Sequence, residues 1–314
     1  MPPELTPSVL ALVLAVAWDV LLGEPPARLH PVVGMGRAID LALRWSPRGR
    51  PPVELLYGAM IALVLPTTCA LAAWALLAGL ANVPVARVLV EAYLLKSAFA
   101  LRALGEATLV VRDALRKRDL GAARVALRSL CSRDAARLDA PLVAAAAIES
   151  VAENASDSVV APLLAYLVLG LPGALFYRAA NTLDARIGYR GRYEYLGKAA
   201  ARLDDALNLI PARLTARLLL IAGRREGRDV RRAAAVRARD ARRTASPNAG
   251  HPMATMAGLL GVQLEKPGVY RLGDAGAPVT AAQVDQAWRL TAGAAAAMLL
   301  LALAGAGLRY AVAL

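Results

Sequence analysis

Three acidic residues recur at a spacing that would place them on one face of a helix. Glu149, Glu153 and Asp157 occupy positions i, i+4 and i+8 of the run ESVAENASD, and Asn154 lies beside them. Carboxylates stacked in this way repel one another unless a cation lies between them. Mg²⁺ prefers oxygen ligands and is a common carrier of nucleotide phosphates. The pattern therefore favours a magnesium–phosphate site, although pairing of these acids with nearby arginines is the simpler structural alternative.

A second acidic cluster lies farther along the chain, in the run ARLDDALNLIPAR. Asp204, Asp205 and Asn208 fall within one predicted helical turn, which Pro211 should end because proline disrupts a helix interior. The D-D-x-x-N pattern can hold a metal-bound phosphate, but it is a weak signal by itself. Two acidic clusters that flank a basic segment are more specific than either one alone. We predict that both clusters supply metal ligands, namely Glu153, Asp157, Asp204 and Asp205.

Arginines and tyrosines crowd the segment between the two acidic clusters, NTLDARIGYRGRYEYLG. Arginine forks suit phosphate or carboxylate groups, and tyrosines provide flat surfaces and hydroxyl donors. Both residue types also serve as plain anchors at membrane interfaces, but the interspersed glycines favour a shaped loop. The residues predicted to bind substrate or phosphate in this segment and in the runs beside it are Asn154, Arg178, Asn181, Tyr189, Arg190, Arg192 and Asn208. The predicted catalytic residues are Glu149, Glu153, Asp157 and Asp184.

A third polar block, SPNAGHPMATMAGLLGVQLEKPGVYRLG, begins at Ser246. Ser246 and Asn248 can form a tight polar turn, and Pro252 suits the first turn of a helix that starts there. We expect Glu265 and Lys266 to close this helix. The block could be a mere connector, but a connector does not require so many hydrogen-bonding side chains together. The residues predicted to bind substrate or phosphate in and before this block are Arg213, Ser246, Asn248 and Lys266.

The composition indicates what kind of protein must position these residues. Of 314 residues, 58% are apolar and only 19% are charged, and the mean hydropathy is +0.46, which is typical of a multi-span helical membrane protein. The net charge of +13 resides mostly in arginine-rich loops, which reflect the positive-inside rule more often than nucleic-acid binding. Two cysteines and two histidines establish neither a disulfide framework nor a zinc site.

The alternation of apolar and basic segments predicts an all-α, multi-span helical integral membrane protein. Apolar runs at 5–22, 54–80, 85–101 and 291–313 are candidate spans, and the first is expected to be retained because no basic region precedes it. Arg87, Glu91 and Lys96 interrupt the third run and should face the protein interior or the membrane interface. A basic amphipathic stretch at 102–140 predicts two helices with a break at Asp119–Gly121.

The arginine-rich loops should be cytoplasmic, so the protein is expected in the cell membrane with its active site facing the cytoplasm. Residues 158–175 must then leave and return to the same side, as a re-entrant or interfacial segment buried within protein. We predict a single membrane-embedded domain over residues 1–314. Its parts are a cytoplasmic helical insertion (102–140), a polar site block (149–213), a basic tract and loop (213–274) and a last span (291–313).

Four stretches of the chain resemble the membrane-bound CobD/CbiB family of cobalamin biosynthesis proteins, the adenosylcobinamide-phosphate synthases. They occur in order and are DVLLGEPPARLHPVVGMG, ESVAENASDSVVAPLLAYLVLGLPGALFYRAANTLDARIGYR, YLGKAARLDDALNLIPARL and SPNAGHPMATMAGLLGVQLEKPGVYRLG. They extend from Asp19 to Gly273, which is far more specific than any short motif. Arg186 departs from the methionine that the family pattern suggests.

The resemblance implies a late step in vitamin B12 assembly. It implies ATP-dependent formation of an amide between (R)-1-amino-2-propanol, or its O-phosphate, and a propionate carboxylate of adenosylcobyric acid. The implied cofactors are ATP and Mg²⁺. The expected partners are the two substrates, the lipid membrane, and either a second copy of the chain or other corrinoid-pathway enzymes, with no nucleic acid.

Two other functions fit the same residues less specifically. A membrane prenyltransferase or CDP-alcohol phosphotransferase also uses two acidic clusters, magnesium and a phosphate leaving group, and it would turn over without ATP. A transporter or scaffold of the corrinoid pathway would account for acids near the membrane without any catalysis.

Overall fold

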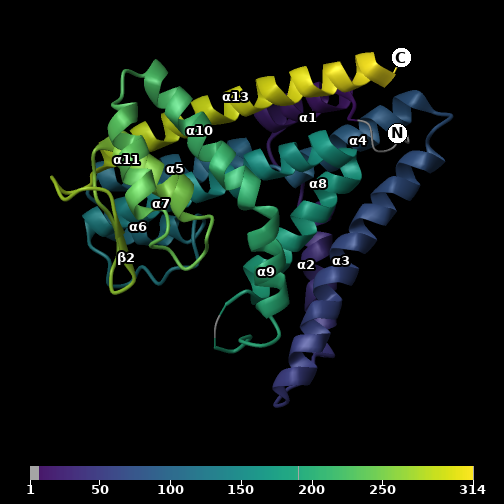
Figure 1. Cartoon of the computed structure of the whole chain (residues 1–314), viewed down its shortest axis with the longest axis horizontal. Coiled ribbons are helices and arrows are strands. Elements are labelled where there is room, and N and C mark those ends of the chain that lie inside the picture. Colours follow the sequence, from purple (N-terminus) through teal and green to yellow (C-terminus); the bar gives the residue numbers. More distant parts are fainter. Residues whose placement is uncertain (1–6, 190, 314) are drawn as a thin grey trace. The chain divides into compact units, whose positions relative to one another are not determined.

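The computed structural model describes residues 7–189 and 191–313, with side chains up to Arg309. This part of the chain is mostly helical (Figure 1). The helices are α1 (Val9–Leu22), α2 (Pro31–Arg44), α3 (Pro51–Gly79), α4 (Pro84–Ala98), α5 (Leu101–Arg116), α6 (Leu120–Leu127), α7 (Ala140–Ala155), the π-helix η2 (Ser156–Val160), α8 (Ala161–Ile187), α9 (Lys198–Leu207), α10 (Leu209–Arg225), α11 (Val230–Asp240), α12 (Gly250–Leu260) and α13 (Ala281–Ala313).

The chain folds into two compact units. Unit 1 comprises Met1–Ala100, Ala161–Leu207 and Leu299–Leu314, and unit 2 comprises Leu101–Val160 and Asn208–Met298. The block 149–213, which is continuous in the sequence, is therefore divided between the units.

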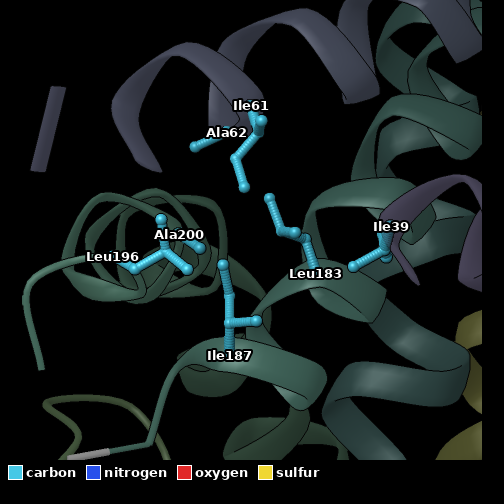
Figure 2. Packing of buried hydrophobic residues seen from close by; sticks show 7 residues of the cluster. All are labelled: Ile39, Ile61, Ala62, Leu183, Ile187, Leu196 and Ala200. Carbon is cyan, nitrogen blue, oxygen red and sulfur yellow. The ribbon is translucent and has the colours of Figure 1, made fainter. Parts of the chain in front are cut away.

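The core of unit 1 joins helices that are far apart in the sequence. Figure 2 shows Leu183 and Ile187 of α8 reaching toward Ile61 of α3 and toward Ala200 of α9. Leu183 and Ile187 are four residues apart, so both project from one face of α8. Each large side chain buried in this way stabilises the fold by about 1.5–3 kcal/mol. This core holds α9, which carries the second acidic cluster, against α8.

Helix α8 is broken within its apolar half. Gly170 adopts φ +63° and ψ −157°, and Leu169 is also non-helical. This backbone conformation is essentially restricted to glycine. Pro172 lies two residues after Gly170 and cannot donate the hydrogen bond that a continuous helix would need there. The break divides α8 into an apolar part and a polar part that ends at Ile187.

Unit 2 is built around two helices that are buried nearly all round. Every residue of α7 from Val143 to Ala152 is buried, as is α12 from Gly250 to Leu259 apart from the half-buried His251. Most of these residues are small, so neighbouring helices approach closely, as is common in membrane proteins. Helix α7 packs against α5, α12 and the strand β1, and α12 packs against α10 and α11. Helix α7 thus carries Glu149 and Glu153 of the first acidic cluster within unit 2, and Asp157 follows in η2.

Unit 2 also contains a short β-hairpin that the all-α prediction does not include. Strand β1 (Leu264–Lys266) pairs antiparallel with β2 (Tyr270–Leu272), and Lys266 lies opposite Tyr270. The expectation that Glu265 and Lys266 close a helix is wrong, because α12 ends at Leu260 where Gly261 turns left-handed. Pro252 does lie in the first turn of α12, as predicted.

Two further predictions about helix ends have different outcomes. The break in the basic stretch is confirmed, since Asp119 caps the start of α6 by accepting a hydrogen bond of 2.8 Å from the Ala122 amide. Pro211 does not end the second acidic helix. Helix α9 already ends at Leu207, and Pro211 lies in the first turn of α10, where proline is tolerated.

Three helices of the described chain are long and apolar enough to cross a membrane. They are Pro51–Gly79, the continuous stretch Ala140–Ile187 and Ala281–Arg309, and a bent pair formed by α9 and α10 would make a fourth. The first and last agree with the predicted spans at 54–80 and 291–313. Helix α1 is apolar but has only 14 residues, and α4 has 15. A membrane protein is the architecture that these lengths support.

Candidate functional site

The first acidic residue of the ESVAENASD run forms a buried ion pair. The carboxylate of Glu149 in α7 pairs with the guanidinium of Arg133, and the Glu149 side chain is only 3% exposed. Burial lowers the pKa of Arg133, but the negative charge of Glu149 more than offsets this and raises it. Sequence reasoning missed Arg133 because it lies in a loop with no periodic pattern. Glu149 therefore follows the structural alternative, in which an acid of this run pairs with an arginine.

The next acids face a more open environment. Glu153, Asn154, Asp157 and Ser158 are all half-buried, whereas the residues on either side of them are buried. Asn154 donates a hydrogen bond of 2.8 Å to the Ser150 carbonyl. The stripe continues into the π-helix η2, whose wider turns are often associated with functional sites. Glu153 and Asp157 thus form a carboxylate pair, one helical turn apart, on the accessible side of a buried helix.

The β-hairpin brings two further side chains to this helix. Tyr270 and Lys266 both lie within electrostatic range of the Glu149 carboxylate, and the Tyr270 hydroxyl contacts the Met253 sulfur at 3.9 Å. Burial, followed by the charges of Glu149 and Glu153, raises the pKa of Tyr270 well above its usual value. Lys266 is a predicted site residue, and the structure brings it near the acids. Tyr270 was not predicted, although it stands in the matching block.

Helix α10 and the polar turn before α12 meet in the same unit. The Arg213 guanidinium donates to the Asn248 side-chain oxygen at 3.3 Å and to the Leu209 carbonyl at 2.7 Å. The Ser246 hydroxyl accepts a hydrogen bond of 3.2 Å from the Asn248 amide, which forms the tight turn that the sequence predicts. Helix α10 also packs against η2. Three predicted residues therefore converge here, and Asn208 is buried just before α10.

Unit 1 assembles the second acidic cluster on two packed helices. The Asn181 side chain of α8 donates a hydrogen bond of 3.1 Å to the Asp204 carboxylate of α9. Asp205, Asp184 and Arg178 are half-buried on the same two helices. Asp184 folds back against Gly188, where any side chain would collide with its carboxylate oxygen. The structure therefore brings acids and amides of α8 and α9 together within unit 1.

The arginine–tyrosine loop is more exposed than these helices. Tyr189 is 52% exposed, and the Arg192 guanidinium lies over the Tyr193 ring at 5.3 Å from its centroid. Arg192 also lines a surface groove together with Arg48 and Glu54. The predicted phosphate ligand Arg190 lies outside the described residues. Arg186 forms an exposed ion pair with Asp40 of α2, which gives it a structural partner in this chain.

The N-terminal matching block forms an ion cluster that sequence reasoning only partly anticipated. The Lys96 ammonium of α4 is completely buried and lies 3.1 Å from Asp19 and 2.9 Å from Glu24. His30 Nε2 lies 3.0 Å from the other Glu24 oxygen. Burial raises the pKa of Glu24, but the hydrogen bonds from His30 and Lys96 lower it by more. The prediction that Lys96 faces the protein interior is confirmed.

Carboxylates alone do not make a complete metal cage anywhere in the described chain. Within residues 7–189 and 191–313, no three His, Cys, Asp or Glu side chains converge so as to hold a metal ion. Mg²⁺ usually needs less, because it keeps several waters and is bound by one or two carboxylates together with substrate phosphates. The Glu153–Asp157 pair has the chemistry and the accessibility for that mode. So does the Asp204–Asp205 pair in unit 1.

Comparisons with known proteins agree on one family. A family model described as CobD/Cbib protein matches residues 12–306. The chain is 47% identical over 265 residues to the cobalamin biosynthesis protein CobD of Chromobacterium violaceum, covering 82% of this chain and 81% of that protein. It is 40% identical over 298 residues to the CobD protein of Geobacter metallireducens, covering 92% and 93%. It is also 40% identical over 267 residues to the CobD protein of Dehalococcoides mccartyi, covering 85% and 87%. No matching solved structure was found.

Proposed function

The chain belongs to the CobD/CbiB family and acts in cobalamin biosynthesis, and from this premise we propose that it is an amide-forming ligase. Its substrates would be adenosylcobyric acid and (R)-1-amino-2-propanol or its O-phosphate, and its product adenosylcobinamide or its phosphate. The observation that carries the proposal is the family match over residues 12–306. Each of the polar clusters described above has residues in stretches that resemble this family.

The chemistry requires an activated carboxylate. A propionate carboxylate is a poor electrophile, so its oxygen would attack the γ-phosphorus of ATP, forming an acyl phosphate and releasing ADP. The amine nitrogen would then attack the acyl carbon and expel inorganic phosphate. The nitrogen must lose a proton as the amide forms, and a positioned carboxylate can accept it. Glu153 and Asp157 are the accessible carboxylates of unit 2 and are the candidates for this role.

Mg²⁺ fits the proposal as a companion of the nucleotide. Glu153 and Asp157 in unit 2, or Asp204 and Asp205 in unit 1, would hold it, and it would offset the negative charge of the phosphates. Arginines bind phosphate oxygens in a bidentate manner, and Arg178, Arg192 and Arg213 are the described candidates. Amide and hydroxyl side chains such as Asn154 and Asn181 would bind the amide-bearing rim of the corrin.

We also propose that the arginine-rich loops face the cytoplasm, together with the site. The positive-inside rule supports this orientation, and it places the nucleotide on the side of the membrane where ATP is made. The break at Gly170 supports a re-entrant or interfacial course for 158–175, because a broken helix can be accommodated where protein satisfies the freed backbone groups.

The direct test is an assay of the purified protein with ATP, Mg²⁺, adenosylcobyric acid and either form of the amino alcohol. Amide product and ADP should appear in equal amounts. Product without ATP consumption, or turnover with a prenyl or CDP-alcohol donor, would favour a transferase. Substrate binding without any product would favour a transporter or scaffold.

Two variants test the assigned carboxylates. Asp157→Ala and Asp204→Ala should each lower kcat by about 100-fold or more, because each removes a group that orients the reaction or its metal. Glu106→Ala is the matched control, since Glu106 is 62% exposed in a surface pair with Arg102, and it should change kcat less than about twofold. Full turnover by both folded aspartate variants would show that the residue assignment is wrong.

A further inference from the structure

Three arginines and a histidine gather at the start of α12 in unit 2. Arg213 comes from α10, Arg237 from α11, Arg242 from the turn after α11, and His251 from the first turn of α12. The three arginines act electrostatically on His251, and α12 packs against both α10 and α11. We call these four residues the arginine–histidine cluster. Arg213 belongs to the proposed site, whereas the other three have no role in it so far.

The arginines of this cluster are not neutralised by carboxylates in the way that their neighbours are. Arg232 and Arg239 pair with Asp274, and Arg239 and Arg243 pair with Asp240. In the part of the chain that the structure describes, none of the three cluster arginines forms an ion pair with a carboxylate. Arginine stays protonated in proteins. The cluster therefore keeps three positive charges, two of them on half-buried side chains.

The local backbone holds this charge in place. A Cβ atom at Gly250 would lie 2.1 Å from the Ala241 carbonyl oxygen, so only glycine lets the turn that carries Arg242 pack against the start of α12. The hydrogen bond to Asn248 fixes the Arg213 guanidinium beside the same turn. Ala249, at the N-cap of α12, offers no side-chain hydrogen bond to the helix. The helix N-terminus adds its own partial positive charge to the cluster.

His251 adds a buried ring nitrogen to the arginine–histidine cluster. This atom, Nδ1, has no hydrogen-bond partner among the described residues. Burial and then the charges of Arg213, Arg237 and Arg242 lower the pKa of His251, which favours the neutral ring. Three fixed cations with a neutral hydrogen-bonding ring suit a doubly charged anion that offers several oxygens.

We propose that the arginine–histidine cluster binds a phosphate group of a substrate, with Arg237, Arg242 and His251 completing the site that begins with Arg213, Ser246 and Asn248. This rests on the proposed function, which supplies two phosphate sources, the phosphorylated amino alcohol and ATP. A terminal phosphate is doubly charged near neutral pH in either compound, so the shared chemistry is a phosphate dianion. Lipid phosphodiesters carry a single charge and match three arginines less well.

Equilibrium binding to the purified protein tests this without any turnover. The probes are aminopropanol O-phosphate, ATP in the absence of metal, unphosphorylated aminopropanol, and nanodiscs with or without anionic lipid. Arg237→Ala and Arg242→Ala should each weaken binding of one phosphate compound by about 10-fold or more, because each removes a charge-assisted hydrogen bond. The compound that responds identifies the source. Unphosphorylated aminopropanol should not respond.

Arg231→Ala is the matched control. Arg231 lies on α11 like Arg237, is exposed and forms no ion pair among the described residues, so its loss removes the same charge from the same helix. It should change the dissociation constant less than about twofold. Equal weakening by Arg231→Ala and Arg237→Ala, or unchanged binding in both cluster variants, would overturn the proposal. So would a response confined to anionic nanodiscs.

Kinetic and binding measurements distinguish a failure of the phosphate-site proposal from a failure of the ligase proposal. Amide formation with unchanged KM for ATP and for the phosphorylated amine in both cluster variants would reject the cluster while the ligase stands. Cluster-dependent binding of a phosphate compound by a protein that forms no amide would support the phosphate site and reject the ligase.

Discussion

At the scale of single residues, the structure separates acids that serve the fold from acids that remain accessible. Glu149 is buried and paired with Arg133, whereas Glu153 and Asp157, on the same helical run, are half-buried. The sequence alone shows one regular stripe of three acids. It cannot show which of them meets an arginine, because the arginine comes from a loop outside the repeat.

Arg133→Ala should strongly destabilise unit 2. Removing one partner of a buried ion pair leaves an uncompensated charge, which costs about 3–5 kcal/mol, and the Glu149 side chain is only 3% exposed. Thermal unfolding in detergent should therefore shift to markedly lower temperature. Arg102→Ala, which breaks an exposed i,i+4 pair with Glu106, should cost less than about 1 kcal/mol. Similar unfolding temperatures for the two variants would contradict the buried pair.

His251 should make stability depend on pH near neutrality. Because the pKa of His251 is lowered in the folded state, the unfolded chain binds a proton first as the pH falls. The contribution is complete above about pH 6.5, the usual value for histidine, and is lost as the pH drops toward the folded-state pKa. Relative to His251→Gln, the wild-type protein should lose thermal stability between pH 7 and pH 5. A constant difference between the two proteins across that range would refute this.

At the scale of elements, long periodic segments were predictable and short irregular ones were not. The spans at 54–80 and 291–313 agree with α3 and α13, and Asp119 marks a helix start as expected. The π-helix η2 and the hairpin of β1 and β2 were missed. Strands of three residues have no measurable period, and a π-turn depends on tertiary packing more than on local residue types. The site residues brought by these elements, such as Tyr270, were missed with them.

The break in α8 depends on one glycine. Gly170→Ala should destabilise the protein by about 1–3 kcal/mol, because φ +63° with ψ −157° is strained for any residue with a Cβ atom. Gly34→Ala is the control, since Gly34 lies in the regular helix α2 and a Cβ atom there would have no neighbour within 4 Å. That substitution should be neutral or stabilising by up to about 1 kcal/mol. Equal stability of both variants, compared by thermal unfolding, would argue against the break.

At the scale of the whole molecule, each compact unit is formed from segments that are far apart in the sequence. The family blocks are distributed over both units, since residues up to Ala100 and Ala161–Leu207 belong to unit 1 whereas Leu101–Val160 and Asn208–Met298 belong to unit 2. The sequence predicted the residue types of the clusters and their helical settings. It could not predict which clusters share a unit, because that depends on long-range packing.

The two native cysteines can report the orientation in the membrane. Cys69 lies in the candidate span Pro51–Gly79, and Cys131 lies in the basic loop before α7. If that loop is cytoplasmic, a membrane-impermeant thiol reagent should label Cys131 in inverted vesicles but not in intact cells. Cys131→Ser should abolish the labelling, and Cys69→Ser should leave it unchanged. Labelling of Cys131 in intact cells would place the loop on the opposite side.

The buried Lys96 also couples the docking of two helices within unit 1. Its ammonium lies 3.1 Å from the Asp19 carboxylate of α1, and a buried carboxylate without a cation is costly. Lys96 comes from α4, 72 residues beyond Glu24, the other acid of the cluster. The docking of α1 therefore depends on α4 through charge as well as through the packing of the two helices.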